Sequence, residues 1–290
     1  MAESFGRQKS EKEKAGSMTA TNRLPVWFIP HGGGPCFFMD PPAKAPNAWK
    51  AMEAYLRGIP AAVGQQRPRA ILIISGHWQE NRPTVTAAAN PPLIYDYFGF
   101  PPHTYDLRYP SPGDPELAAE VIARLKAAGI DSGEDLSRGF DHGVFIPLLL
   151  LYPDADIPVV QLSMVHPLDP ARHIAIGRAL APLRDEGVLI IGSGLSFHNL
   201  QNFYGADRRV LAVAETFDAW LTKAVTNADP AARDAALAAW DQAPGARISQ
   251  PYEDHLIPLM VAAGAAGADQ GVRDYSDHVF GAPISGYRFG

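Results

Sequence analysis

The chain has 290 residues, of which 47% are hydrophobic and 19% are charged, and this composition indicates a folded protein with a sizeable core. Its 25 Lys and Arg residues against 31 Asp and Glu residues give a net charge of −6, which argues against a nucleic-acid partner. The single cysteine, Cys36, excludes a disulfide framework and any cysteine-rich metal site. No apolar run approaches the ~18 residues of a membrane helix, so no membrane partner is expected.

Residues 1–23 differ from the rest of the chain because they are polar and mixed in charge. They lack the apolar stretch of a secretory signal, and their composition predicts a flexible N-terminal extension. Residues 24–290 contain neither an internal repeat nor a long linker, and we expect them to form one domain. The lone cysteine and the missing signal together favour a cytoplasmic protein.

Strand and helix patterns alternate along residues 24–290. This alternation predicts an α/β fold with a central, largely parallel or mixed sheet covered by helices. In chain order the patterns predict a strand at 26–29, a helix at 45–57, strands at 70–75 and 83–88, a helix at 114–128, an apolar segment at 144–151, a strand at 158–164, a helix at 169–183, a strand at 188–191, and helices at 208–226, 230–240 and 255–263. The last of these is expected to end at Gly264, and Asp114 is expected to be the N-cap of the helix at 114–128.

Three of the predicted strands are followed by glycine and histidine. His31 follows the strand at 26–29, His77 follows the strand at 70–75, and His198 follows the strand at 188–191. In open α/β sheets the ligand crevice lies beyond the carboxyl ends of the strands. We therefore expect these imidazoles to meet in one metal site or one acid–base site.

Two further histidines are candidates for the same site. His142 precedes the apolar segment at 144–151, and the neighbouring Asp141 is a candidate for fixing its tautomer. His255 opens the last predicted helix, beside Glu253 and Asp254, which are also potential metal ligands. The histidines without supporting context are expected to be structural, namely His166, His173 and His278.

Two chemistries compete for these histidines. The run from His31 to Gly34 is similar to the oxyanion-hole motif of some esterases, but the G-x-S-x-G motif that a serine hydrolase needs is missing. The nearest match, residues 194–198, has His198 in place of the last glycine. The favoured reading is one metal ion held by imidazoles, and with nitrogen and oxygen ligands the candidates are iron(II), zinc and manganese.

The same residues give the chain a family resemblance. It resembles the DOPA-dioxygenase-type class III extradiol ring-cleavage dioxygenases, which belong to the superfamily of the protocatechuate 4,5-dioxygenase catalytic subunit. The resemblance spans about residues 25–290. The matching motifs are His31-Gly32, Gly76-His77-Trp78, Asp141-His142-Gly143, Gly192-Ser193-Gly194 with His198-Asn199-Leu200, residues 255–259, residues 95–101 and the closing residues 287–290.

The resemblance implies that residues 24–290 are a catalytic domain that opens a catechol-type aromatic diol with O2 at a mononuclear non-haem metal. It implies Fe(II) for activity, with Zn(II) as a possible bound metal, and His31, His77 and His255 as ligands. His198 would be the acid–base residue or a further metal ligand. His142 would help to bind the catechol or the activated oxygen.

A positioned imidazole suits this chemistry because a catechol loses at least one proton when it binds a divalent metal. The remaining substituent of the substrate needs other contacts, and an aromatic, proline-rich loop offers them. Its candidate substrate-binding residues are Tyr97, His103, Tyr105 and Arg108. The alternatives are a zinc-dependent hydrolase on the same histidines and a catalytically silent metal- or ligand-binding homologue. A homo-oligomer is compatible with the sequence.

Overall fold

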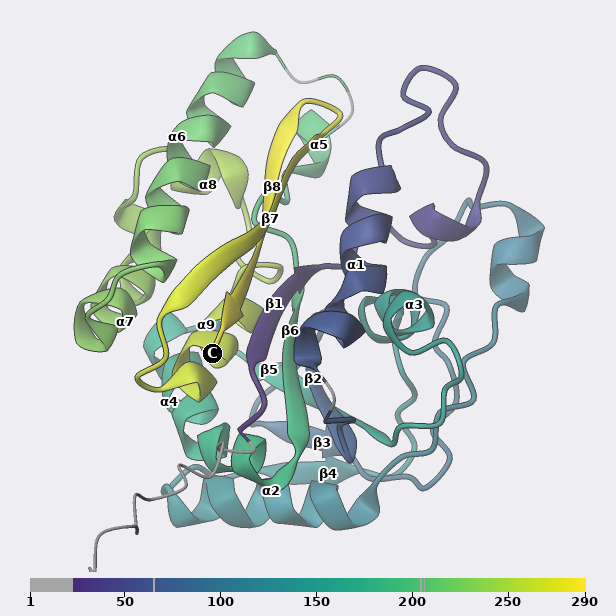
Figure 1. The fold of residues 1–290 in the computed structure, drawn as a ribbon, viewed down its shortest axis with the longest axis vertical. Coiled ribbons are helices and arrows are strands. Elements are labelled where there is room, and N and C mark those ends of the chain that lie inside the picture. The colour runs from purple at the N-terminus through teal and green to yellow at the C-terminus, as the bar shows by residue number, and fades with distance from the viewer. Residues whose placement is uncertain (1–22, 65, 204, 206) are drawn as a thin grey trace, which may run out of the picture.

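The computed structural model describes residues 23–290 apart from 65, 204 and 206, so the predicted extension at 1–23 lies almost entirely outside the described residues. Within the described residues the strands form an eight-stranded sheet in the order β4-β3-β5-β2-β6-β1-β8-β7 (Figure 1). The strands are β1 (Val26–Pro30), β2 (Ala70–Glu80), β3 (Thr84–Thr86), β4 (Gly133–Asp135), β5 (Val159–Val165), β6 (Val188–Gly194), β7 (Gly271–Val279) and β8 (Ala282–Phe289).

The sheet is mixed, with a parallel centre. β5, β2, β6 and β1 run parallel to one another, whereas β8 is antiparallel to both β1 and β7. At the other side β3 pairs antiparallel with β5 and parallel with β4. The carboxyl ends of the four central strands therefore open at one edge of the sheet. This arrangement confirms the predicted α/β class.

Helices cover both faces of the sheet because the strands are apolar on both sides. In β2, Ile71 and Ile73 belong to one apolar cluster, and Leu72 and Ile74 belong to the other. The first cluster packs under α1 (Lys50–Val63) and α3 (His142–Leu151). The second packs under helices on the opposite face (Figure 1), namely α2 (Pro115–Ala127), α4 (Pro170–Leu180), α6 (Arg208–Val225), α7 (Pro230–Ala238) and α9 (Ile257–Ala266). Two single-turn helices complete the described set, α5 (Leu200–Phe203) and α8 (Ala246–Ser249).

Several helix boundaries follow local signals. Asp114 caps α2 through its side chain, which accepts from the backbone N–H of Leu117, as the sequence predicted. The helix predicted at 45–57 instead begins at Lys50 and continues to Val63. Its buried stripe reaches Ile59, two residues beyond the predicted end, and this packing extends the helix through Pro60.

The end of α9 corrects a second prediction. Gly264 does not stop the helix, which begins at Ile257 and continues to Ala266. A side chain on Gly264 would lie 2.0 Å from the carbonyl oxygen of Ile174 in α4. The glycine therefore permits close packing of two helices in place of terminating one. His255 lies in the turn that precedes α9.

The C-terminal hairpin of β7 and β8 was not predicted. Its outer strand β7 carries the exposed polar residues Arg273, Asp274 and Ser276, and so it lacks an apolar run that sequence patterns detect. The apolar segment at 144–151 proves to be the buried helix α3. In the part of the chain that the structure describes, no helix has the length and apolarity required to cross a membrane.

Candidate active site

Three imidazoles converge at the carboxyl edge of the sheet. The Nε2 atom of His77 lies 3.2 Å from Nε2 of His31 and 3.2 Å from Nε2 of His255. His31 directly follows β1, His77 lies within β2, and His255 lies in the turn before α9. His31 and His255 are buried, and His77 is partly buried. Residues far apart in the chain thus offer three nitrogens to one point.

A bulge in β2 places His77. Ile74 pairs with Leu162 and Gln79 pairs with Met164, so β2 has four residues between these pairs where β5 has one. Bulges re-aim side chains and are common beside active sites. His77 therefore lies inside a strand, whereas the sequence placed it after the end of a shorter one.

Hydrogen bonding sets the tautomer of His31. Its Nδ1 lies 3.0 Å from Ser193 Oγ, and the same hydroxyl donates to the carbonyl oxygen of Gly143. Because its proton is used in that bond, the hydroxyl must accept from Nδ1–H. The lone pair of His31 is therefore on Nε2, the nitrogen that faces the other two imidazoles.

Carboxylates lie behind the other rings. Asp254 Oδ1 is 2.9 Å from Nδ1 of His255, at an angle unsuited to a hydrogen bond, and it accepts from the backbone N–H of the same residue. Asp96 Oδ2 lies 3.8 Å from Nδ1 of His77. Negative charge near each Nδ1 favours a proton on that nitrogen. The lone pair of each ring is then on Nε2, the nitrogen that faces the other imidazoles.

Burial keeps the three rings neutral at pH 7. It lowers the pKa of His31 and of His77 well below the ordinary value, and the neighbouring imidazoles lower both further. Burial likewise lowers the pKa of His255 to about 4. Metal–nitrogen bonds of ~2.0–2.1 Å place two imidazole nitrogens on one ion roughly 3.0–3.4 Å apart, so the observed separations of 3.2 Å fit a single ion.

His142 flanks this group. Its ring lies 3.9 Å from that of His77 between centroids, and its Nδ1 is 2.8 Å from Asp96 Oδ1. The backbone N–H of His142 donates to the same oxygen. Asp96 therefore orients His142, and the expectation for Asp141 is wrong. The buried Asp141 side chain instead accepts from Ser75 and Gln161.

His198 lies on the other side and is more open to solvent. Its ring stacks on His255 with centroids 3.4 Å apart, and its Nδ1 lies 3.6 Å from Asp254 Oδ1. Burial opposes ionisation of Asp254, but His198 and His255 outweigh it and lower the pKa of the carboxyl overall. The backbone N–H of His198 donates to the carbonyl of Ser249, which fixes the segment after β6.

All five candidate histidines line one cavity of about 210 Å³. The structure thus brings together the residues that the sequence proposed as ligands and acid–base groups. The rest of the lining was not proposed and consists of Gly32, Gly33, Gly34, Phe100, Leu195, Leu200 and Phe203. Phe100 and Leu200 fall within the quoted motifs, but a motif does not reveal which side chain faces the cavity.

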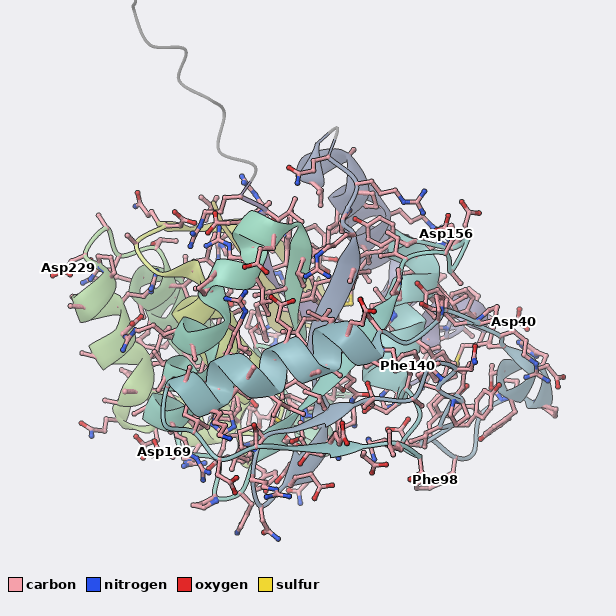
Figure 2. The ribbon with its side chains drawn as sticks, turned by 90° about the horizontal axis from the view of Figure 1, so that it is seen from below. Asp40, Phe98, Phe140, Asp156, Asp169 and Asp229 are labelled. Atoms are coloured by element: carbon pink, nitrogen blue, oxygen red, sulfur yellow. The ribbon has the colours of Figure 1, made fainter. Side chains whose placement is uncertain are left out.

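The four proposed substrate-binding residues lie outside the described lining of this cavity. Tyr97 packs edge-on against both Phe100 and His142, at centroid distances of 5.5 and 5.8 Å. Exposed His103 has its Nε2 3.0 Å from the carbonyl oxygen of Phe38. Arg108 donates to the hydroxyl of Tyr95, and Phe98 of the same loop projects from the edge of the molecule (Figure 2). Tyr97 and Tyr105 form a layer behind Phe100, and the role of the four in substrate binding stays a prediction.

Other candidates are occupied elsewhere. Glu253 pairs with Arg247. Cys36 is buried, its sulfur accepts from the backbone N–H of Gly33, and burial raises the pKa of its thiol. Ser196, the nearest match to a hydrolase nucleophile, is buried and accepts from the backbone N–H of Ser285. The His173 ring is buried and accepts from the backbone N–H of Val165, in keeping with a structural role.

A histidine-lined cavity at the carboxyl edge of an α/β sheet is the arrangement expected of a metal-dependent enzyme. Residues 25–290 match the family described as the catalytic LigB subunit of aromatic ring-opening dioxygenase, and the chain belongs to this family. It is therefore an extradiol ring-cleaving dioxygenase that acts on an aromatic substrate with O2.

Named relatives agree with this assignment. The chain is 40% identical to the dioxygenase tasH of Hapsidospora irregularis, over 94% of this chain and 87% of that one. It is 37% identical to a 4,5-DOPA dioxygenase extradiol of Beta vulgaris, over 88% of this chain and 96% of the relative. The crystal structure of an uncharacterized Escherichia coli K12 protein aligns with a TM-score of 0.73 and 28% identity, over 92% of this chain and all of that one.

Proposed function

We propose that the protein opens a catechol-type ring next to one hydroxyl, using iron(II) held by His31, His77 and His255. The observation that carries this proposal is the convergence of three neutral imidazoles, with Nε2 of His77 3.2 Å from Nε2 of each of the other two. Three protein ligands leave positions free for a diol and for O2, and an all-nitrogen set without thiolate suits iron(II). Zn(II) is the competing occupant. Insertion of both oxygen atoms of O2 gives a muconic semialdehyde.

A bound iron(II) ion would act as a Lewis acid toward the diol oxygens and supply the redox chemistry that O2 requires. The chain's own residues manage the protons. Asp254 near Nδ1 of His198 favours a proton on that nitrogen and leaves Nε2 to accept one from a catechol hydroxyl. The same carboxylate then stabilises the imidazolium. In a zinc-loaded protein, His198 would instead be a further ligand.

His142 is proposed to hold the substrate or O2 from the opposite side. Because Asp96 accepts from both its backbone N–H and its Nδ1, the ring is fixed with Nε2 free. Tyr97 and Tyr105 are proposed to influence substrate binding through Phe100, against which they pack. His103 and Arg108 would contribute by holding the same loop.

The proposal is tested by preparing metal-free protein and loading it anaerobically with iron(II). On addition of a catechol and air, we expect O2 consumption and a yellow product. Iron-free protein loaded with zinc is the control. Equal turnover by the zinc-loaded protein would refute the iron-dependent reaction. Metal binding without turnover of any catechol would favour the silent homologue.

The single cysteine is buried, and we propose a cytoplasmic location on that ground because a reducing compartment suits an unpaired thiol. Fractionation of the source cells with an antibody to the protein tests this. Recovery with secreted proteins would contradict it.

A further inference from the structure

The cavity has two chemically different parts. Five histidines line one part, and apolar side chains with glycine backbone line the rest. Leu195 and Phe203 are buried, whereas Leu200 is 67% exposed at the mouth. A volume of about 210 Å³ is below the roughly 300 Å³ at which pockets for drug-sized ligands begin. The space suits one aromatic ring with a short substituent.

Phe100 lines the cavity beside Gly34, which has no side chain to displace the ring. Gly34 has a positive φ of 55°, and a side chain there would lie 2.9 Å from the Phe100 ring. The glycine-rich turn after β1 therefore leaves space for an aromatic ring in the lining of the cavity. The layer of Tyr97 and Tyr105 behind Phe100 supports that position.

Among residues 23–290, leaving aside 65, 204 and 206, no lysine or arginine lines the cavity. Three arginines of neighbouring segments, Arg108, Arg138 and Arg247, have other partners. Arg138 pairs with Asp141 and lies over the ring of Trp78. Arg247 pairs with Glu253, and Arg108 donates to a tyrosine hydroxyl and a backbone carbonyl.

The charged groups nearest the histidines are carboxylates. Asp96 and Asp254 lie behind the rings, with Asp96 Oδ1 2.8 Å from Nδ1 of His142 and Asp254 Oδ1 2.9 Å from Nδ1 of His255. Their two negative charges would balance the two positive charges of a divalent metal ion. A second anionic group on the substrate, beyond the catecholate itself, would meet an apolar wall without a cation.

We propose that the enzyme selects catechols with a short, uncharged, apolar substituent and discriminates against catechols that carry a carboxylate. Phe100, Leu195 and Leu200 are the residues that determine this preference. The inference rests on the proposed function, because it names the substrate class of the same site. It assigns no direct substrate contact to Arg108, which donates to the hydroxyl of Tyr95 and is not among the residues that line the cavity.

The first test compares three substrates of similar size: 4-methylcatechol, 3,4-dihydroxybenzamide and 3,4-dihydroxybenzoate. The amide withdraws electrons from the ring as the acid does but is neutral, so it separates charge from reactivity. We expect kcat/KM for the benzoate to be on the order of 10²-fold below that for methylcatechol, with the amide between them. Dissociation constants measured by calorimetry on zinc-loaded protein without O2 should follow the same order.

The second test introduces a cation at the mouth. Leu200→Arg should reduce the discrimination against the benzoate by about tenfold or more, because the guanidinium can pair with the carboxylate. Leu136→Arg is the matched control, since Leu136 is 68% exposed against 67% for Leu200 and lies outside the cavity lining. The control should leave the ratio of kcat/KM values unchanged. Melting temperatures of both variants verify that they are folded.

Each outcome decides the matter. Equal or tighter binding of the benzoate by the unmodified enzyme overturns the inference while the proposed function stands. A shift in Leu136→Arg as large as that in Leu200→Arg shows a general charge effect and also overturns it. If no catechol is bound or opened, the proposed function itself fails, and the inference fails with it.

Discussion

His31 illustrates how one hydroxyl can set the tautomer of a proposed metal ligand. Ser193 donates to the carbonyl of Gly143 and must therefore accept from the ring, which leaves the lone pair on the nitrogen that faces His77. His255 and His77 have carboxylates in the equivalent place. The three proposed ligands thus have different polar groups near Nδ1, and these groups come from different segments. Residues that never touch the metal should accordingly alter its affinity.

Ser193→Ala should weaken metal affinity by about 10–100-fold, because the tautomer of His31 loses its partner. Ser196→Ala is a matched control, since Ser196 is also buried and lies two residues beyond the strand that contains Ser193, but it accepts from the backbone N–H of Ser285. Competition with a chelator measures the affinity of both variants. Equal affinity in the two variants would contradict the role assigned to Ser193.

A second pair of variants separates ligand from base. His255→Ala should lose metal, because one of three protein ligands is removed and no thiolate can compensate. His198→Ala should keep most of its metal but lose turnover by ~10²–10⁴-fold, because the catechol proton loses its acceptor. Metal content and turnover of both purified variants are the measurements. If His198→Ala loses metal as completely as His255→Ala, then His198 is a ligand, and His142 becomes the candidate base.

Helix α9 shows how an element is held in place to carry a site residue. The turn before it contains His255, whose carbonyl accepts from the backbone N–H of Leu195 after β6. At its other end, buried Arg184 donates to the carbonyls of Ala265 and Ala266, and buried Arg233 donates to that of Ala263. The final carbonyls of a helix lack partners within it, and here guanidinium groups satisfy them. The position of His255 therefore depends on contacts at both ends of the helix.

Arg184→Met should lower the free energy of unfolding by roughly 3–5 kcal/mol, because buried carbonyls and the Asp269 carboxylate lose their partner. Arg178→Met is the control, since its side chain is 64% exposed and its ion pair with Asp234 should contribute only about 0–1 kcal/mol. Urea denaturation of both variants measures the difference. A loss below about 1 kcal/mol for Arg184→Met would contradict this account.

Over the whole molecule, buried neutral histidines link stability to pH. Burial lowers the pKa of His173 and of His255 to about 4, and it lowers the pKa of His31 and of His77 as well. In the unfolded chain these groups titrate near ~6.5, so the unfolded state binds more protons between the two pKa values. Their neutral forms therefore stabilise the fold fully above ~6.5, and this stabilisation is lost as the pH falls.

We expect the free energy of unfolding of the metal-free protein to fall steadily between pH 6.5 and pH 5. A histidine whose pKa in the folded state is about 4 should account for a loss on the order of 2 kcal/mol. Urea denaturation at each pH measures this. His173→Gln, remote from the metal site, should make the slope shallower. A slope that is flat, or that has the opposite sign, would contradict the prediction.

The α/β class and the clustering of five histidines could both be predicted from the sequence alone. Both depend on short-range patterns, since apolar runs define strands and the carboxyl ends of parallel strands share one edge. His31 and His198 could be assigned to that edge because each closely follows a central strand. The N-cap at Asp114 was equally local.

The side chains that complete the site could be identified only from the tertiary structure. Asp96 and not Asp141 orients His142, a bulge turns His77 inward, and Phe100 lines the cavity in place of the tyrosines behind it. The hairpin of β7 and β8 also emerged only in three dimensions, because its outer strand carries no apolar pattern. These features depend on contacts between segments far apart in the chain. Local patterns fix the conformation of a segment, but the packing of one segment on another fixes which face of it meets the substrate.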